Sequence, residues 1–241
     1  MKRRTAKFGL VPGSTTMLLS APSKMPGYSW SLPAFKSCPR ANGTICHGDK
    51  HGGGCYATKG FYTLYPAVQR AQNVRFDWTR ESLKTSDGRR TWIETLYRAI
   101  YRTSESGERY FRVHDSGDMF SAAYAAAWVQ VMARLDKVRF WVPTRAWQIP
   151  KTNGLFNVVT ESDALYRQLI EMAGLANVTV RPSALNFGDL APIVQGLHAG
   201  TTADCPSVDM AQCPAHWQDN KCGKCRTCWN EKGTEVSYTR H

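Results

Sequence analysis

Apolar residues recur three or four positions apart in several stretches of the chain, which is the spacing of one face of a helix. The ranges 63–76 and 90–105 both show it. Residues 121–135 are rich in alanine, the strongest helix former, and open with Ser121, a favourable N-cap residue. The range 160–174 opens with Thr-Glu and closes with glycine. We therefore predict four helices over these ranges.

Short runs of β-branched and aromatic residues lie between the predicted helices. They read YFRVH over 110–114, VRFWV over 138–142 and NVTVR over 177–181, and we predict a strand at each. Pro143 and Pro182 follow the second and third runs, and we expect each proline to end its strand. Residues 1–60 are rich in Pro, Gly and Ser and are predicted to be extended and looped.

The resulting order is β-α-β-α-β with short connections, which implies parallel strands and right-handed crossovers. The predicted fold class is α/β, with a partial or compact (β/α) barrel as the preferred architecture and an open sheet as the alternative. Ligands of such folds bind at the carboxyl ends of the strands. We divide the chain into a Cys/Gly-rich loop segment (1–60), a barrel-like catalytic core (61–200) and a Cys-rich metal-binding segment (201–241), integrated in one domain.

The composition adds a strong positive charge. The 241 residues include 31 Lys and Arg against 19 Asp and Glu, a net charge of +12, while 42% hydrophobic content indicates a folded globule. A folded protein this basic is expected to meet a polyanion, with nucleic acid as the first candidate. The chain has no apolar run of membrane-spanning length, and its basic start is broken early by Pro12 and Gly13. We therefore expect a cytoplasmic protein, in the host cytoplasm if it is phage-encoded, with no membrane partner.

The eight cysteines form two groups, which favours metal binding over a disulfide scaffold. The C-terminal group contains a C-x2-C-x2-C run whose thiolates can converge on one ion. Its predicted ligands are Cys213, Cys222, Cys225 and Cys228, with Cys205 or His216 as alternatives. The expected cofactor is zinc, and a [4Fe–4S] cluster is the alternative. The N-terminal group, in a glycine-rich stretch, is either a second metal site or a structural loop that carries thiols; its members are Cys38, Cys46 and Cys55.

The end of the first predicted strand carries candidate catalytic groups. His114, Asp115 and Asp118 follow one another around Ser116 and Gly117. Two carboxylates in a partly buried site push each other's pKa apart, so that one can act as nucleophile or base while the other donates a proton. The competing interpretation is a turn that only caps the following helix, and it accounts for Asp118 more easily than for the other two.

The ends of the other strands carry candidate binding groups. Arg145, after Thr144, could hold a phosphate or carboxylate, and Trp141 or Trp147 could stack on a base. Arg181 ends the third predicted strand. The competing interpretation is a buried aromatic residue beside a surface arginine.

Three motifs in the same order resemble those of the tRNA-guanine transglycosylase superfamily. Asp115-Ser116-Gly117 with Phe120-Ser121 resembles its Asp-Ser-Gly-Gly-Phe-Gln segment, and Val142-Pro143-Thr144-Arg145 is similar to its Val-x-Pro-Thr-Arg segment. The C-terminal cysteines resemble its zinc ligands, although the spacing here is C-x2-C-x2-C rather than C-x-C-x2-C. The resemblance covers about 30 residues and is strongest to phage DpdA-type 7-deazaguanine DNA transglycosylases.

This resemblance implies a base-exchange enzyme that replaces guanine in DNA, or in RNA, with a 7-deazaguanine base. The family's nucleophile lies four residues before the proline of the second motif, where this chain has Arg139, so Asp115 or Asp118 must take that role. Asp115 would form the covalent glycosyl intermediate, with Asp118 or His114 as general acid/base. The target nucleoside would be flipped out of the stack. The expected substrate-binding residues are Ser116, Gly117, Phe120, Trp141, Thr144, Arg145 and Arg181.

A second resemblance leads to a different class of enzyme. Cys55-Tyr56-Ala57, after a glycine-rich loop, resembles the Cys-Tyr-Ala ending of some radical-SAM-like cluster loops, although the usual C-x3-C-x2-C spacing is absent. The first alternative function is therefore an iron–sulfur redox or radical enzyme, in which the cysteines carry the chemistry and the two aspartates are secondary. The second is a zinc-containing nucleic-acid-binding protein without catalysis.

Overall fold

The computed structural model describes residues 8–38, 55–58, 60–150, 156–158, 162–184, 202–203, 211–230 and 236–237. A parallel sheet with the strand order β1-β2-β3-β6-β7-β9-β8 forms its centre. The longer strands are β1 (Tyr28–Trp30), β2 (Tyr110–Val113), β3 (Arg139–Thr144) and β6 (Val178–Ala184). The others are β7 (Thr202–Ala203), β8 (Ala211–Gln212) and β9 (Val236–Ser237). The α/β class and the parallel pairing are thus confirmed.

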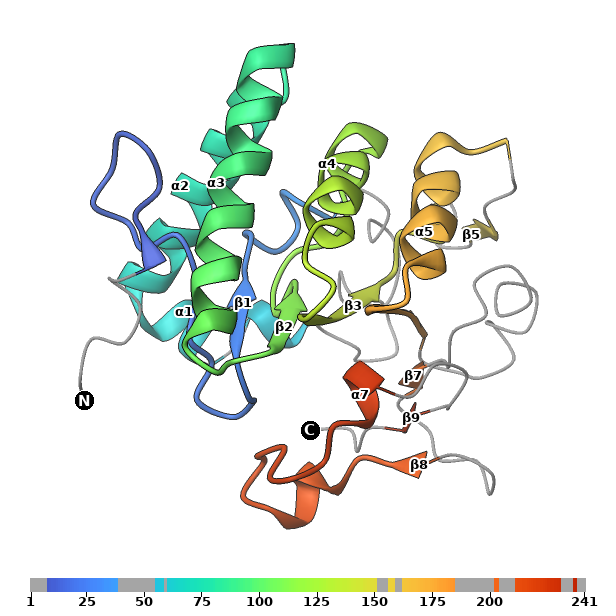
Figure 1. The fold of residues 1–241 in the computed structure, drawn as a ribbon. Coiled ribbons are helices and arrows are strands. Elements are labelled where there is room, and N and C mark those ends of the chain that lie inside the picture. The colour runs from blue at the N-terminus through green and yellow to red at the C-terminus, as the bar shows by residue number, and fades with distance from the viewer. Residues whose placement is uncertain are drawn as a thin grey trace.

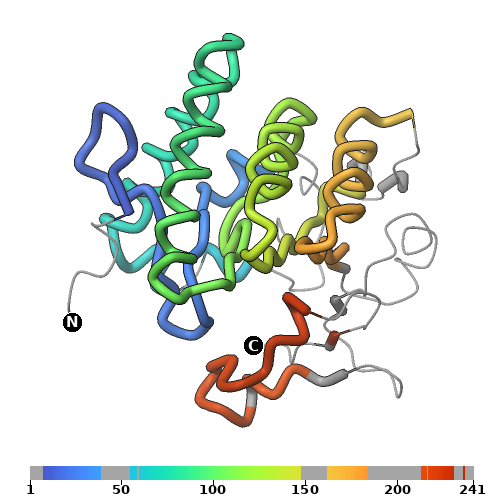
Figure 2. Tube along the Cα trace, viewed as in Figure 1, coloured from blue at the N-terminus to red at the C-terminus, as the bar shows by residue number. Residues whose placement is uncertain are grey.

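The helices connect the strands in sequence. They are α1 (Phe61–Leu64), α2 (Pro66–Ser82), α3 (Ser86–Glu105), α4 (Ala122–Ala133), α5 (Ala164–Gly174) and α7 (Thr227–Asn230). Two 3-10 helices, η4 (Tyr56–Thr58) and η6 (Pro214–Trp217), and an antiparallel pair of strands, β4 (Gln148–Pro150) and β5 (Phe156–Val158), complete the described elements. The trace in Figure 2 passes steadily from the β1 side to the β6 side.

One face of the sheet is covered by helices. Figure 1 shows α3, α4 and α5 side by side on the same side of the strands. Alternate residues of β2 and β3, such as Phe111 and Phe140, are fully buried in the same hydrophobic core as the helices. Trp30 of β1 meets Trp92 of α3 and Trp128 of α4 edge to face, with ring centroids 6.1 and 6.3 Å apart. Burial of these large aromatic side chains stabilises the packing of the helices on this face.

The helix starts follow from capping side chains. Ser121 accepts a hydrogen bond from the Tyr124 amide (3.2 Å), as predicted, and Thr85 does the same for the Gly88 amide (3.0 Å). The helix predicted over 160–174 begins later, at Ala164, because Asp163 accepts a hydrogen bond from the Tyr166 amide (2.8 Å). The range 63–76, predicted as one helix, is divided at the extended Tyr65 between α1 and α2, and α2 continues beyond it to Ser82.

The opposite face of the sheet, here called the inner face, is covered by the Cys-rich segment 213–230. The Trp229 ring packs against Trp141 of β3 with centroids 5.0 Å apart, and its indole N–H donates to the Phe111 carbonyl (3.2 Å). Arg181 of β6 is fully buried and donates to the carbonyl of Thr227 (3.0 Å). Figure 1 shows α7 and the chain before it on the side away from α4 and α5.

Pro143 and Pro182 do not end their strands, contrary to expectation, since β3 and β6 both run through them. In β3 the Phe140 amide donates to the β6 side and the Arg139 amide to the β2 side. Because successive amides of β3 face β2 and β6 in turn, the nitrogen of Pro143 faces β2. It lies beyond the last pair of β2 with β3, Arg112 with Trp141, so no hydrogen bond is lost there. Pro182 likewise lies before the first β6–β7 pair. Neither proline therefore interrupts a ladder bond.

The described helices include none that is both long enough and apolar enough to cross a membrane. The predicted looping of residues 1–60 holds for most of the described part, but it missed β1, which is only three residues long.

Candidate active site at the carboxyl edge of the sheet

The turn after β2 lies at the carboxyl edge of the sheet and is held in an unusual backbone conformation. His114 has φ of 70° and Gly117 has φ of 87°, both in the left-handed region. A Cβ on Gly117 would lie 2.5 Å from the Ser37 hydroxyl and 2.7 Å from the Leu32 Cβ. Only glycine therefore fits at this position, because both the backbone angle and the close approach exclude a side chain.

Asp115 is the partly exposed carboxylate of this turn. One carboxylate oxygen accepts a hydrogen bond from the Ser31 hydroxyl, just after β1. Its backbone carbonyl accepts from the Tyr62 hydroxyl (3.1 Å) and also from the Tyr56 hydroxyl. Asp115 is thus oriented from two neighbouring segments while its side chain remains accessible.

Asp118 is buried, and both of its carboxylate oxygens accept hydrogen bonds. One oxygen accepts from the Thr144 hydroxyl (2.6 Å) and the Met119 amide (2.7 Å), and the other accepts from the Arg145 amide (2.8 Å). Burial raises the pKa of Asp118, and these three donors oppose the rise. The carboxylate joins the turn after β2 to the end of β3, which is a structural role and accounts for its position.

His114 faces the aromatic core. Its Nε2 lies 2.9 Å from the Tyr124 hydroxyl, and its Nδ1 has no hydrogen-bond partner among the described residues. Burial, aided by the positive charge of Arg112, lowers the pKa of His114 to about 3. The imidazole is therefore neutral near pH 7, and its Nε2 faces Tyr124 of α4.

Arg112 and two tyrosines complete the edge. The Arg112 guanidinium donates to the His114 carbonyl (3.0 Å) and to the Tyr56 hydroxyl (3.2 Å), and it lies 4.4 Å from the centre of the Trp141 ring. Although 57% of Tyr56 is exposed, its hydroxyl is directed inward. Desolvation raises the pKa of Tyr56 to about 12, against the opposing charge of Arg112. Desolvation also raises the pKa of Tyr62.

The residues next to Cys38 and Cys55 form hydrogen bonds with the same turn. The Ser37 carbonyl, next to Cys38, accepts from the Asp118 amide (3.2 Å), and Tyr56, next to Cys55, donates to Asp115. Burial raises the pKa of the Cys55 thiol, and the charge of Arg145 partly offsets it. Cys46 lies outside the described residues.

The C-terminal cysteines gather at the inner face. Burial raises the pKa of Cys222 to about 11, and the nearby thiols of Cys228 and Cys213 raise it further. Cys213, Cys222 and Cys228 also pack around Trp141 and Trp229. Cys205 lies outside the described residues, as does the side chain of His216. Within the described part of the chain, no three His, Cys, Asp or Glu side chains are close enough together to form a finished metal site.

The structure does not bring all the predicted binding residues to this edge. Trp141 and Arg181 lie beneath the Cys-rich segment, and Phe120 stacks on Tyr124 with centroids 4.4 Å apart. Trp147 is buried and donates to the Ser183 carbonyl (3.0 Å). The residues that do meet at the edge are Asp115, Ser116, Gly117, Asp118, Thr144 and Arg145.

Sequence reasoning missed Ser31, Tyr56, Tyr62 and Arg112 as members of this edge. The Cys-Tyr-Ala sequence drew attention to the cysteine but not to the tyrosine beside it. Arg112 lies within a strand, and only the alternation of its neighbours shows that it shares a face with Tyr110.

Comparison with known proteins gives a family but no relative with an assigned role. No curated protein and no solved structure is similar to the chain. The family model described as "Gene product 88" matches residues 7–231, which include every strand of the sheet except β9, the carboxyl edge and both cysteine groups. The chain therefore belongs to the Gene product 88 family.

Proposed function

We propose that the protein is an iron–sulfur enzyme of the radical-SAM-like class, with Cys38, Cys46 and Cys55 as cluster ligands and the carboxyl edge as the reaction site. One observation carries the proposal: the residues next to Cys38 and Cys55 both hydrogen-bond to the turn that presents Asp115. The described ends of the cysteine segment, at Cys38 and Cys55, are therefore next to residues at the carboxyl edge, where parallel α/β folds bind their ligands.

The arrangement of the sheet supports this assignment. The strands β1, β2, β3 and β6 follow one another across the sheet in chain order, with the helices between them on one face. A sheet wound in one direction curves toward a barrel, and we take it to be an incomplete (β/α) barrel. This architecture agrees with the radical-SAM resemblance of the Cys-Tyr-Ala segment.

The donor set suits a cluster with one open iron. Three thiols would leave one iron of a [4Fe–4S] cluster without a protein ligand. When bound, such a cluster supplies the electron that cleaves S-adenosylmethionine reductively. Arg145 supports the thiolate form of Cys55 by its positive charge, because it lowers the pKa that burial raises. Asp115, held by Ser31, offers an oriented hydrogen-bond acceptor to a substrate at the edge.

The C-terminal cysteines would hold a second, structural metal. Cys213, Cys222, Cys225 and Cys228 supply four thiols, which is the number of ligands in a closed zinc site. Four thiolates on one zinc carry a net negative charge, and Arg112 lies close enough to lower the pKa of Cys222. Zinc is the metal we assign here, with an additional iron–sulfur cluster as the alternative.

Paired cysteine variants separate the two sites. In Cys55→Ser, purified without oxygen, we expect loss of about four iron and four sulfide per chain and of 5′-deoxyadenosine formation from S-adenosylmethionine, with zinc retained. In the matched variant Cys225→Ser we expect zinc to be lost and iron retained. The measurements are metal and sulfide content, the visible spectrum and the cleavage assay. Wild-type protein that holds neither iron nor sulfide after anaerobic reconstitution would contradict the proposal.

A second candidate function, DNA–guanine base exchange, is favoured by the setting of Asp115. Its carboxylate is accessible and oriented by Ser31, as a nucleophile must be. One carboxylate oxygen would bond to C1′ as the C1′–N9 bond breaks, and its electron pair would go to guanine, which takes up a proton as it leaves. The incoming 7-deazaguanine would lose its N9 proton and bond to C1′, which releases the carboxylate. Asp118 suits the acid/base role less well, because it is buried and both of its oxygens already accept hydrogen bonds from Thr144, Met119 and Arg145.

Asp115→Asn tests this candidate because it keeps the shape and removes the nucleophile. We expect exchange of labelled guanine in duplex DNA to fall at least about 1000-fold, as for loss of other covalent nucleophiles. Asp77→Asn, which replaces an exposed carboxylate of α2, is the control and should retain full exchange. Wild-type protein without exchange activity would exclude this function, whereas unchanged exchange in Asp115→Asn would exclude Asp115 as the nucleophile. Neither outcome affects the cluster assignment.

A further inference from the structure

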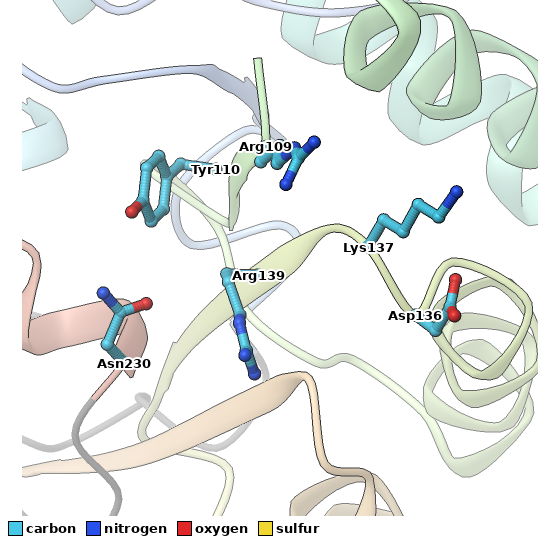
Figure 3. Close-up of a pocket in the computed structure, with 6 residues that line it drawn as sticks. All are labelled: Arg109, Tyr110, Asp136, Lys137, Arg139 and Asn230. Carbon is cyan, nitrogen blue, oxygen red and sulfur yellow. The ribbon is translucent and has the colours of Figure 1, made fainter. Parts of the chain in front are cut away.

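A cleft of about 400 Å³ lies at the amino edge of the sheet, opposite the candidate active site. Figure 3 shows the side chains that line it: Arg109, Tyr110, Asp136, Lys137, Arg139 and Asn230. Arg109 directly precedes β2, Arg139 opens β3, Lys137 lies in the turn between α4 and β3, and Asn230 ends α7. Four separate elements therefore contribute to one concave surface, which distinguishes it from the charged face of a single helix.

The cleft is dominated by positive charge. Arg109, Lys137 and Arg139 are exposed, and none of them forms a salt bridge with another described residue. Some arginines of the helical layer are paired instead: Arg98 and Arg134 share Glu94, and Arg90 pairs with Asp87. Asp136 is the single acidic residue of the lining. The cleft thus has a surplus of cations within the described structure.

The backbone fixes the two arginines close together. Arg139 pairs in register with Tyr110, and its amide donates to the Arg109 carbonyl (2.7 Å). The Arg139 guanidinium donates one N–H to the Ala176 carbonyl (3.2 Å), which orients it and leaves most of its five donors for a ligand. A guanidinium held in this way matches two oxygens of one phosphate.

We infer that this cleft binds the phosphates of a nucleic-acid backbone. The lining has cations and one amide but only one aromatic ring, so it suits a phosphodiester rather than an apolar peptide or a lipid tail. The positive surface continues beyond the cleft, because Arg226 lies 5.0 Å from the centre of the Tyr110 ring. The net charge of +12 favours a polyanion over a single small anion. The inference does not depend on the chemistry at the carboxyl edge.

A charge-reversal pair with a matched control tests the inference. The test variant is Arg109→Glu with Lys137→Glu, and the control is Arg70→Glu with Arg89→Glu, two exposed arginines of α2 and α3 that change the net charge equally. Binding of a fluorescent duplex of about 20 base pairs and of the matching single strand is measured by anisotropy across a salt series. We expect the test variant to bind about tenfold or more weakly at about 100 mM salt, and the slope of log K against log salt to fall by about two.

The other outcomes contradict the inference. Equal losses in the test and control variants would indicate a general charge effect, and unchanged binding in the test variant would place the nucleic acid elsewhere. A loss that affects vesicles of phosphatidylserine and phosphatidylcholine, with nucleic-acid binding intact, would assign the cleft to a membrane surface. Because all four substituted residues are exposed, unchanged circular dichroism and thermal unfolding are expected and serve as the folding control.

Discussion

Asp118→Asn is expected to lower the free energy of unfolding by about 3 kcal/mol, without any direct effect on a bound substrate. The carboxylate accepts three hydrogen bonds, from Thr144, Met119 and the Arg145 amide. An asparagine amide can accept through its oxygen, but its NH₂ group would then face a donor. One buried N–H or O–H would lose its partner, and an unsatisfied buried group costs about 1–3 kcal/mol in addition to the loss of charge-assisted bonds.

Urea denaturation followed by circular dichroism measures this change as a lower transition midpoint with an unchanged slope. Asp136→Asn replaces an exposed carboxylate of the same chain and should change stability by less than about 0.5 kcal/mol. If Asp118→Asn were as stable as the wild-type protein, the carboxylate would not be the joint between the turn after β2 and the end of β3. Asp118 would then return as a candidate acid or base.

Arg181→Met is expected to cost about 3 kcal/mol and to detach the Cys-rich segment from the inner face. Arg181 is fully buried and donates to the carbonyl oxygens of Thr227 and Cys228 (3.0 and 3.4 Å). Methionine fills a similar volume but offers no donor, so both carbonyls would remain buried without these bonds. Thr179 would still hold the Trp229 carbonyl (3.0 Å), so partial contact is expected to persist.

Detachment is measured separately from global stability. Thiol labelling of Cys228, which is buried in the native protein, should become faster under native conditions, and limited proteolysis should cut within residues 213–230. Arg139→Met is the matched control. Arg139, in the neighbouring strand β3, also donates to a backbone carbonyl, but its side chain is exposed. Equal labelling rates in Arg181→Met and the wild-type protein would show that Trp229 alone fixes the segment.

Local signals in the sequence were sufficient for most of the helical layer. Ser121 and the alanine-rich run located α4 to within two residues, because a capping side chain and helix propensity act within one or two turns. α5 was placed too early because Thr160 and Glu161 resemble a helix start as much as Asp163 does. β1 was missed, since three residues are too few for alternation to be recognised.

The prolines show where local reasoning fails in the sheet. Whether Pro143 or Pro182 ends a strand depends on which neighbour its missing N–H faces and on how far that neighbour extends. Both are properties of the register between distant segments. No pattern within β3 or β6 contains that information.

The candidate site, too, was predictable from the sequence only in part. The sequence placed Asp115, Asp118 and Arg145 at strand ends, and the structure brings them together at one edge. The sequence did not indicate that the buried Asp118 carboxylate would accept three hydrogen bonds. Nor did it indicate that the Cys-rich segment would cover Arg181 and Trp141. These distinctions depend on contacts across 26 to 88 positions of the chain, such as Asp118 with Thr144 and Trp141 with Trp229.

The covering of the inner face also has a consequence for biosynthesis. The strands β1, β2, β3 and β6 are complete before the ribosome has made α7, whose residues bury Trp141 and accept the hydrogen bonds of Arg181. In a nascent chain whose sheet is already covered by helices on one face, the other face is therefore open to solvent. That face carries Trp141 and Arg181. Transiently exposed apolar surface of this kind makes folding intermediates prone to aggregate, and the exposure lasts until α7 has been made and has packed against the sheet.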